Sequence, residues 1–432
     1  MPSTRVRINP DRLWQSLMEL AKVGATGRGG VCRLALSDAD KEARDLFAQW
    51  CREAGCSVDV DAVGNMFAQR AGRNAATPAV LTGSHLDTQP NGGRFDGAYG
   101  VLAGLEVIRA LNDASTETEA AIEVVAWSNE EGTRFAPSMM GSMAYTGALD
   151  LQRVYATMDA QGSSYLTALE RIGYRGESLG GRSLAAYFEA HIEQGPILEE
   201  TFNTIGVVTG AQGQSWYDLS LVGQDAHAGS TPMDRRRDAL VGAAAVIDAI
   251  HRMATSFPPG GCATVGHLTV HPNSRNVIPG RVAMTIEIRH PDDTKRALMD
   301  HALRAAVDAA AAKQRLEATL GQVLDQAAVP FDARCIAAVR NAAALEGYPH
   351  VELVSGAAHD AVAIARIAPT AMIFVPCAGG ISHNEIESAT PSDLAAGCQV
   401  LLDAMCDMAS DGSLTIDCAR QGSLRDFVGM TK

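Results

Sequence analysis

The expected secondary-structure pattern of this chain changes between residues 213 and 325. On either side, short apolar runs alternate with helical periodicity, which is typical of an α/β domain with a mostly parallel sheet. Within this stretch the expected order is strand, helix, strand, strand, helix, strand, a small α+β unit with two helices on one face of a four-stranded sheet. The sequence therefore predicts a discontinuous α/β domain, residues 1–211 and 329–432, interrupted by an inserted βαββαβ domain, residues 212–328.

Apolar periodicity also places the individual elements. The β-branched runs VLTGSH (80–85) and AIEVVAWS (121–128) are typical of strands buried on both faces, and a helical pattern lies between them at 98–112. A further buried strand is expected at 370–376. The other helices of the larger domain are expected at 11–24, 39–55, 333–346 and 392–409. In the insertion, helices are expected at 235–254 and 291–314, and strands at 216–223, 262–272, 281–290 and 315–324.

Size and charge restrict the class of protein. A chain of 432 residues is too long for one ordinary hydrophobic core, so two domains are expected. The formal net charge is −14. This charge argues against nucleic acid as the main partner, because nucleic-acid binding relies on cationic side chains that meet phosphates.

Cysteine usage and hydropathy indicate the compartment. The nine cysteines are scattered and include no CxxC pair, which indicates reduced thiols and not a disulfide framework. The N-terminal residues contain no apolar run of a signal peptide, and nothing later approaches the ~18–20 apolar residues that cross a bilayer. We therefore expect a cytoplasmic protein with no membrane partner.

Histidines and carboxylates follow several of the expected strands at the point where each strand ends. His85 ends one strand, Glu130 and Glu131 follow the next, and His191 and His383 follow two more. Because the carboxyl ends of parallel strands bind ligands, imidazoles and carboxylates gathered there would suit a pair of divalent ions such as zinc. A single strand-end histidine or a pair of loop glutamates is more often an ordinary polar residue. From these residues alone, both interpretations stay open.

Seven segments contain these and further polar residues: GSHLDTQPNGGRFDG, SNEEGTRF, HIEQGP, DAHAGSTPMDRRRDAL, NSRNVIPG, SGAAHDA and GISHNEIE. Together they resemble the amidase/hydantoinase/carbamoylase branch of the dinuclear zinc aminoacylase and carboxypeptidase family. They cover nearly the whole chain in the family's order. The resemblance implies two divalent metal ions per subunit. Zinc is the expected metal, and manganese, cobalt and nickel are alternatives. It also implies that the inserted domain is a lid and the contact of a homodimer.

The resemblance further implies a role for each residue of the centre. His85 and His191 would bind one metal ion, Glu131 and His383 the other, and Asp96 would bridge them. Two catalytic residues are implied beside these ligands, namely Glu130 as the general base and Asp87 as the residue that holds the second ring nitrogen of His85. A cis peptide bond is expected between Asp96 and Gly97.

A second set of residues is implied to contact the substrate. His227, in the insertion, would donate to the oxyanion and so act in catalysis; its ordinary alternative is a turn residue that caps a helix. Asn276 and Arg289 would bind a substrate carboxylate, for which the planar guanidinium is suited. Gln194 and Ala357 would lie near the substrate, and His359 would either assist at the carbonyl or only pack.

Within this branch the expected reaction is cleavage of a linear ureido or amide C–N bond in a small carboxylate. N-carbamoyl-L-amino acid hydrolase, β-ureidopropionase and allantoate amidohydrolase are the candidates. Allantoate-directed members tend to carry paired basic residues where this chain has Ser215 and Trp216, which favours an N-carbamoyl-L-amino acid, cleaved to the amino acid, ammonia and carbon dioxide. A peptidase and a non-catalytic binding protein of the same fold are the remaining alternatives; the intact Glu130 argues against the second.

Overall fold

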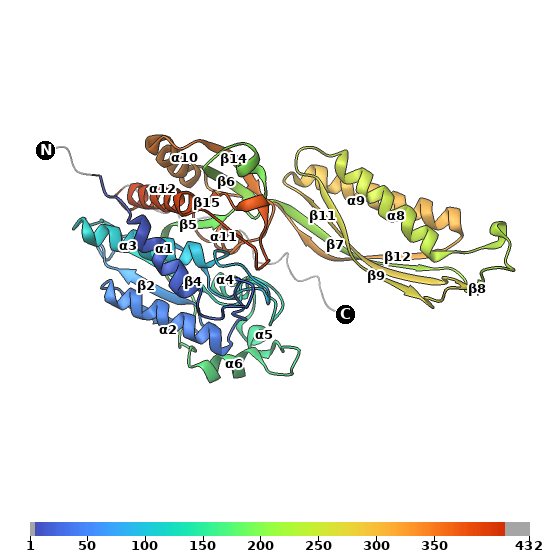
Figure 1. The fold of residues 1–432 in the computed structure, drawn as a ribbon, viewed down its shortest axis with the longest axis horizontal. Coiled ribbons are helices and arrows are strands. Elements are labelled where there is room, and N and C mark those ends of the chain that lie inside the picture. Colours follow the sequence, from blue (N-terminus) through green and yellow to red (C-terminus); the bar gives the residue numbers. More distant parts are fainter. Residues whose placement is uncertain (1–4, 411–432) are drawn as a thin grey trace. The chain divides into compact units, whose positions relative to one another are not determined.

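The computed structural model describes residues 5–410, and these form two compact units (Figure 1). Unit 1 takes in the described parts of Met1–Thr209, Phe331–Leu353 and His359–Lys432. Unit 2 takes in Gly210–Pro330 and the short segment Val354–Ala358. This segment, which contains Ala357, was assigned to the larger domain from the sequence. It belongs to unit 2 because Gln212 bonds to it, donating from its backbone to the carbonyl of Ser355.

A nine-stranded sheet forms the centre of the larger unit. Its order is β1-β2-β4-β3-β5-β15-β6-β13, with β14 paired to β6. The four central strands β4, β3, β5 and β15 run parallel, and the pairs β1–β2, β2–β4, β15–β6 and β6–β13 are antiparallel. The strands are β1 (Ser57–Val60), β2 (Met66–Arg70), β3 (Ala79–His85), β4 (Ile122–Trp127), β5 (Leu184–Ile192), β6 (Ile205–Ala211), β13 (Val329–Pro330), β14 (His350–Ser355) and β15 (Thr370–Val375).

Every residue of the four parallel strands is buried. Strands covered by helices on both faces need this composition, which is why they read as continuous apolar runs in the sequence. Helices α3 and α12 pack against them. The mostly parallel α/β sheet predicted from the sequence is therefore confirmed.

Local capping explains where the helices of unit 1 begin and end. In α10 the side chain of Asp332 accepts the backbone N–H of Arg334, and Gly347 ends the helix with a φ of 73°, so this helix has the predicted bounds. The first helix ends at Leu20, four residues earlier than expected, and the chain leaves it through a turn at residues 21–24 that includes Gly24 with a φ of 74°. The helices are α1 (Pro10–Leu20), α2 (Asp38–Glu53), α3 (Ala98–Asp113), α4 (Met140–Tyr145), α5 (Leu151–Ala156), α6 (Tyr165–Ile172), α7 (Ile197–Glu200), α10 (Ala333–Glu346), α11 (Asp360–Ile364) and α12 (Pro391–Ser410), with a 3₁₀ turn η2 (Ala378–Gly380).

Unit 2 is a four-stranded antiparallel sheet with two helices along one face (Figure 1). The sheet order is β12-β7-β11-β9, and a two-stranded sheet joins β8 to β10. Residues of β7 and β11 that point toward the helices are buried in alternation, as in a sheet with one covered face. The elements are β7 (Gly213–Val222), β8 (Ala226–His227), η1 (Met233–Arg235), α8 (Ala239–Thr255), β9 (Cys262–His271), β10 (Val277–Ile278), β11 (Arg281–His290), α9 (Asp293–Gln314) and β12 (Glu317–Gln326).

The first helix of unit 2 begins later than the sequence pattern indicated. It was expected from residue 235, but α8 starts at Ala239. The Asp238 carboxylate accepts the backbone N–H groups of Leu240 and Val241 and so fixes the helix N-terminus there. Part of the arginine run that suggested an earlier start lies in η1 instead.

Candidate metal centre

The carboxyl ends of the four parallel strands carry the histidines and carboxylates singled out in the sequence. His85 is the last residue of β3, and His191 is the penultimate residue of β5. Two loops complete the set: Glu130 and Glu131 follow β4, and His383 follows β15. Parallel strands end at one edge of their sheet, so these side chains come together with Asp96, which lies just before α3.

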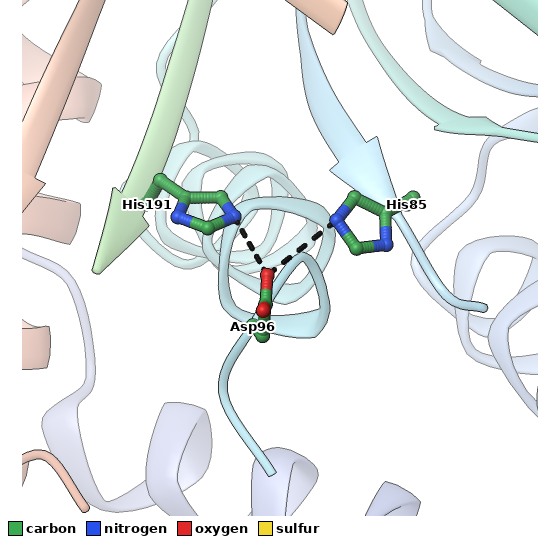
Figure 2. A group of neighbouring side chains, drawn as sticks. All are labelled: His85, Asp96 and His191. Carbon is green, nitrogen blue, oxygen red and sulfur yellow. Dashed lines mark ion pairs between the residues drawn. The ribbon is translucent and has the colours of Figure 1, made fainter. Parts of the chain in front are cut away.

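The first group consists of His85, Asp96 and His191, and its three side chains are buried (Figure 2). The Nε2 atoms of His191 and His85 lie 3.1 and 3.6 Å from Oδ1 of Asp96. The other ring nitrogen of each histidine is bonded to a backbone carbonyl at 2.8 Å, that of Asp87 for His85 and that of Ile192 for His191. A carbonyl only accepts, so each Nδ1 carries a proton, and each Nε2 is the ring atom that faces Asp96.

The second group consists of Asp96, Glu131 and His383. Nε2 of His383 lies 3.2 Å from Oδ2 of Asp96 and 3.4 Å from Oε2 of Glu131. The Asp96 carboxylate therefore turns one oxygen to each group. Unlike the first group, this one is partly open, because the His383 side chain is 51% exposed.

Both groups fit a divalent ion such as zinc. Zinc bonds to nitrogen and oxygen are about 2.0–2.2 Å long, so tetrahedral ligand atoms lie about 3.4 Å apart. The separations between imidazole nitrogens and carboxylate oxygens, 3.1–3.6 Å, match this spacing. The shared Asp96 allows two ions with one bridging carboxylate.

The electrostatics of the site also favour cations. Burial raises the pKa of Glu130 well above its usual value, and the neighbouring carboxylates of Asp360, Glu131 and Asp87 add to this effect. Burial also raises the pKa of Glu131. For Asp96, burial acts in the same direction, but hydrogen bonds from the three histidines outweigh it and hold the pKa well below its usual range. So many buried carboxylates repel one another unless cations compensate them.

Glu130 lies beside the first group without belonging to either. Its Oε2 is 3.5 Å from Nε2 of His85, and it is nearly fully buried. The backbone N–H groups of Glu130 and Glu131 donate to the two carboxylate oxygens of Asp87, each at 3.2 Å. Glu130 is thus held at the edge of the centre, where the sequence placed the general base.

Asp87 holds His85 through a different atom than the sequence analysis implied. The carbonyl oxygen of Asp87 accepts from the ring at 2.8 Å, whereas its carboxylate is 4.0 Å from the same nitrogen. The carboxylate is occupied by the two N–H groups that follow β4. Asp87 therefore connects His85 with the Glu130–Glu131 turn.

The expectation of a cis peptide bond after Asp96 is wrong. In the part of the chain that the structure describes, cis bonds occur only before prolines, as at Ala136–Pro137. A trans bond is the lower-energy form, and the turn is made instead by Gly97 with a φ of 65°. A side chain at Gly97 would collide with His85, since an added Cβ would lie 2.4 Å from Cε1 of that ring.

Three further loop residues hold the centre, and the sequence analysis did not single them out. Gln89 donates to both oxygens of Glu131, from its backbone at 3.1 Å and from its side chain at 2.6 Å. Ser382 and Glu387 contact Asp96. All three lie inside the quoted motifs, but nothing in their spacing separates them from ordinary loop residues.

Two of the expected substrate residues lie next to the centre in unit 1. Gln194 donates from Nε2 to Oδ2 of Asp96 at 3.0 Å. The ring of His359 is 4.5 Å from that of His191, and its Nε2 is buried without a hydrogen-bond partner. Burial lowers the pKa of His359 well below its usual value, so this ring is neutral and has one nitrogen left for a ligand.

The other expected substrate residues belong to unit 2 and lie toward opposite ends of strand β11. His227 is on β8, paired with Val277 next to Asn276, and both His227 and Asn276 are exposed. The Nδ1 atom of His227 accepts the backbone N–H of Gly229 at 3.0 Å, which leaves the Nε2 atom of this ring free. Arg289 is near the end of β11, where it pairs with Glu287 and donates to a carbonyl of the 354–358 segment.

The structure does not bring Asn276 and Arg289 together within one chain. Asn276 precedes the start of β11 at Arg281, and Arg289 follows Arg281 by eight residue steps of extended strand. At about 3.4 Å per residue, this amounts to about 27 Å. One small carboxylate therefore cannot contact both side chains of the same chain.

Comparison with known proteins defines the class. The chain matches the model of peptidase family M20/M25/M40 over residues 81–407, and it belongs to this family.

Individual relatives show which members of this family the chain is similar to. The chain is 46% identical to an N-carbamoyl-L-amino-acid amidohydrolase of Rhizobium meliloti, over 94% of this chain and 98% of that protein. It is 34% identical to the allantoate amidohydrolase of Bacillus subtilis, over 90% and 95%. A crystal structure of an amidase of the hydantoinase/carbamoylase family from Burkholderia multivorans matches with a TM-score of 0.91 at 56% identity, over 94% and 99% of the two chains. The resemblance derived from the seven motifs is confirmed.

Two further observations concern membrane-spanning helices and the state of the cysteines. Within residues 5–410, no helix is long and apolar enough to span a bilayer. All eight cysteines in this range are free thiols, and the ninth, Cys418, lies outside the described residues.

Proposed function

We propose that this protein is a metal-dependent amidohydrolase that converts N-carbamoyl-L-amino acids to the amino acid, ammonia and carbon dioxide. The observation that carries the proposal is the pair of groups that share Asp96, with Glu130 beside them. The names of its relatives support the carbamoyl substrate. We propose zinc as the native metal, since imidazole and carboxylate donors suit it; manganese, cobalt and nickel accept the same donors. We further propose a cytoplasmic location, which the free thiols support.

The residues of the centre divide the chemical work. Bound divalent ions would polarise the substrate carbonyl and lower the pKa of water to near 7. Glu130 takes the proton of the attacking water and delivers it to the amino-acid nitrogen as the ureido C–N bond breaks. The released carbamate decomposes to ammonia and carbon dioxide. Gln194 and the neutral His359 would contact the substrate near the scissile bond, which their contacts with Asp96 and His191 support.

The substrate-binding site would be completed by residues from two copies of the chain. Arg289 matches the substrate carboxylate, and His227 matches the oxyanion with its free Nε2. His227 pairs with Val277 near the start of β11, whereas Arg289 lies near the other end of β11, so a small substrate cannot contact both from one chain. We therefore propose a homodimer, formed through unit 2, in which His227 and Asn276 act on the centre of the partner copy.

Mixing two inactive variants tests this arrangement. Glu130→Gln and His227→Ala homodimers are each expected to be nearly inactive. After subunit exchange under native conditions, half of the dimers contain one chain of each variant. One of the two centres in such a dimer has an intact Glu130 and receives an intact His227 from the other chain. About one quarter of wild-type activity should therefore return. No recovery, with exchange verified by mass, would place His227 in its own chain's centre and refute the proposal.

The substrate class is tested by a panel. Trp216 donates from its indole to Oε1 of Glu287, which also pairs with Arg289, so an apolar ring borders the proposed carboxylate site. We expect kcat/KM for N-carbamoyl-L-amino acids to exceed that for N-carbamoyl-β-alanine and allantoate by about 10-fold or more, the scale of one well-placed contact. Dipeptides should not be cleaved. Ammonia release from metal-loaded enzyme provides the measurement, and a preference for allantoate would favour the alternative that the Bacillus subtilis relative represents.

A further inference from the structure

Glu387 is a buried carboxylate that contacts the centre without belonging to either group. We propose that Glu387 is the positioning residue of the second group, because it fastens the Asp96 loop to the loop that carries His383 and so sets the separation of these two ligands. The inference rests on the proposed two-metal function and adds to it a residue that assembles one of the two sites.

The contacts of Glu387 connect two segments that are far apart in the sequence. Its Oε1 accepts the backbone N–H groups of Phe95 at 2.9 Å and Asp96 at 3.2 Å. Its Oε2 accepts the hydroxyl of Ser382 at 2.8 Å. Ser382 also lies 2.9 Å from Oδ2 of Asp96, the oxygen that faces His383. One carboxylate thus holds both the backbone of the first loop and the residue before His383 in the second.

The packing of the Asp96 loop shows that space is reserved for this carboxylate. A Cβ added at Gly93 would lie 1.9 Å from Cδ of Glu387 and 2.0 Å from its Oε1. Any side chain at position 93 would therefore displace the carboxylate from the loop.

The second group depends on this support more than the first. His85 and His191 are each buried on a central strand and oriented by a neighbouring backbone carbonyl. His383 has no comparable support: its loop follows β15, its φ is 53°, and half of its side chain is exposed. Loss of the Glu387 contacts should therefore affect the second ion and spare the first.

Cobalt(II) titration of the apo protein tests the inference independently of turnover. The wild-type chain is expected to bind two cobalt ions, counted by elemental analysis and followed by visible absorption. Glu387→Ala should keep the first ion at wild-type affinity and bind the second about 10- to 100-fold more weakly, the usual effect of removing a residue that orients a metal ligand. Gly93→Ala, which displaces the carboxylate and leaves the rest of Glu387 in place, should weaken the same ion.

Two further variants distinguish a positioning role of Glu387 from two other effects, namely the loss of its negative charge and the general effect of removing a buried carboxylate. Glu387→Gln should bind both ions, since its amide oxygen can accept both N–H groups and its amide nitrogen can donate to Ser382. Glu193→Ala is the matched control: Glu193 is also buried and accepts two backbone N–H groups, but at the start of α7, so both ions should remain.

The outcomes distinguish the inference from the function on which it rests. If the wild-type chain binds fewer than two ions, the two-metal proposal fails and the inference fails with it. If the wild-type chain binds two and Glu387→Ala binds both equally well, only the role of Glu387 is refuted. The role of Glu387 would also be refuted if Glu387→Gln or Glu193→Ala weakened binding of the second ion as much as Glu387→Ala does.

Discussion

Replacing Glu130 with glutamine is expected to lower kcat by about 10³-fold, within the ~10²–10⁴ that a general base contributes, while both metal ions stay bound. The amide has nearly the shape of the carboxylate but cannot take a proton from water. Glu130 contributes no atom to either group, so its loss should leave the donors of both ions unchanged. Steady-state ammonia release and metal analysis of the same sample give the two measurements.

The adjacent Glu131→Gln variant is the natural control for this experiment. Glu131 belongs to the second group, with its Oε2 3.4 Å from Nε2 of His383. This variant should lose affinity for one ion, and added metal should restore part of its turnover. Metal should not restore Glu130→Gln. A Glu130→Gln enzyme with wild-type turnover would show that another group is the base.

Much of this centre could be predicted because its residues follow a simple topological rule. Buried parallel strands read as continuous apolar runs, and the polar residues that end them, such as His85 and Glu131, must meet at one edge of the sheet. The position of each ligand is thus set by local sequence and strand order. The assignment to individual ions came from family resemblance and stays a prediction; the two groups of neighbouring side chains contain the same residues.

The residues that sequence reasoning missed depend on contacts between distant loops. Glu387 reaches Asp96 across 291 positions of the chain, and Gln89 reaches Glu131 across 42. No periodicity or capping rule marks such pairs. The separation of Asn276 from Arg289 has the same origin, since motifs that share a function in the family need not share an end of one sheet. The late start of α8 was readable in principle, because Asp238 is a strong helix cap.

Asp96→Ala is expected to remove both ions, and with them more than about 10⁴-fold of kcat/KM, since each ion provides several kcal/mol of transition-state stabilisation. Asp96 is the one residue present in both groups, with Oδ1 toward His85 and His191 and Oδ2 toward His383. By contrast, His191→Ala should weaken mainly the first ion and His383→Ala mainly the second. Elemental analysis of the three variants gives the pattern directly.

Stability provides a second measurement of the Asp96 variant. Ions that bind only the folded chain stabilise it by about 4 kcal/mol at a concentration 1,000 times Kd. Metal should therefore raise the Tm of the wild-type protein, and chelation should lower both Tm and activity. Asp96→Ala should show neither response, because its Tm no longer depends on metal. If this variant kept two ions, the shared carboxylate would not be the bridge, and the centre would consist of two independent sites.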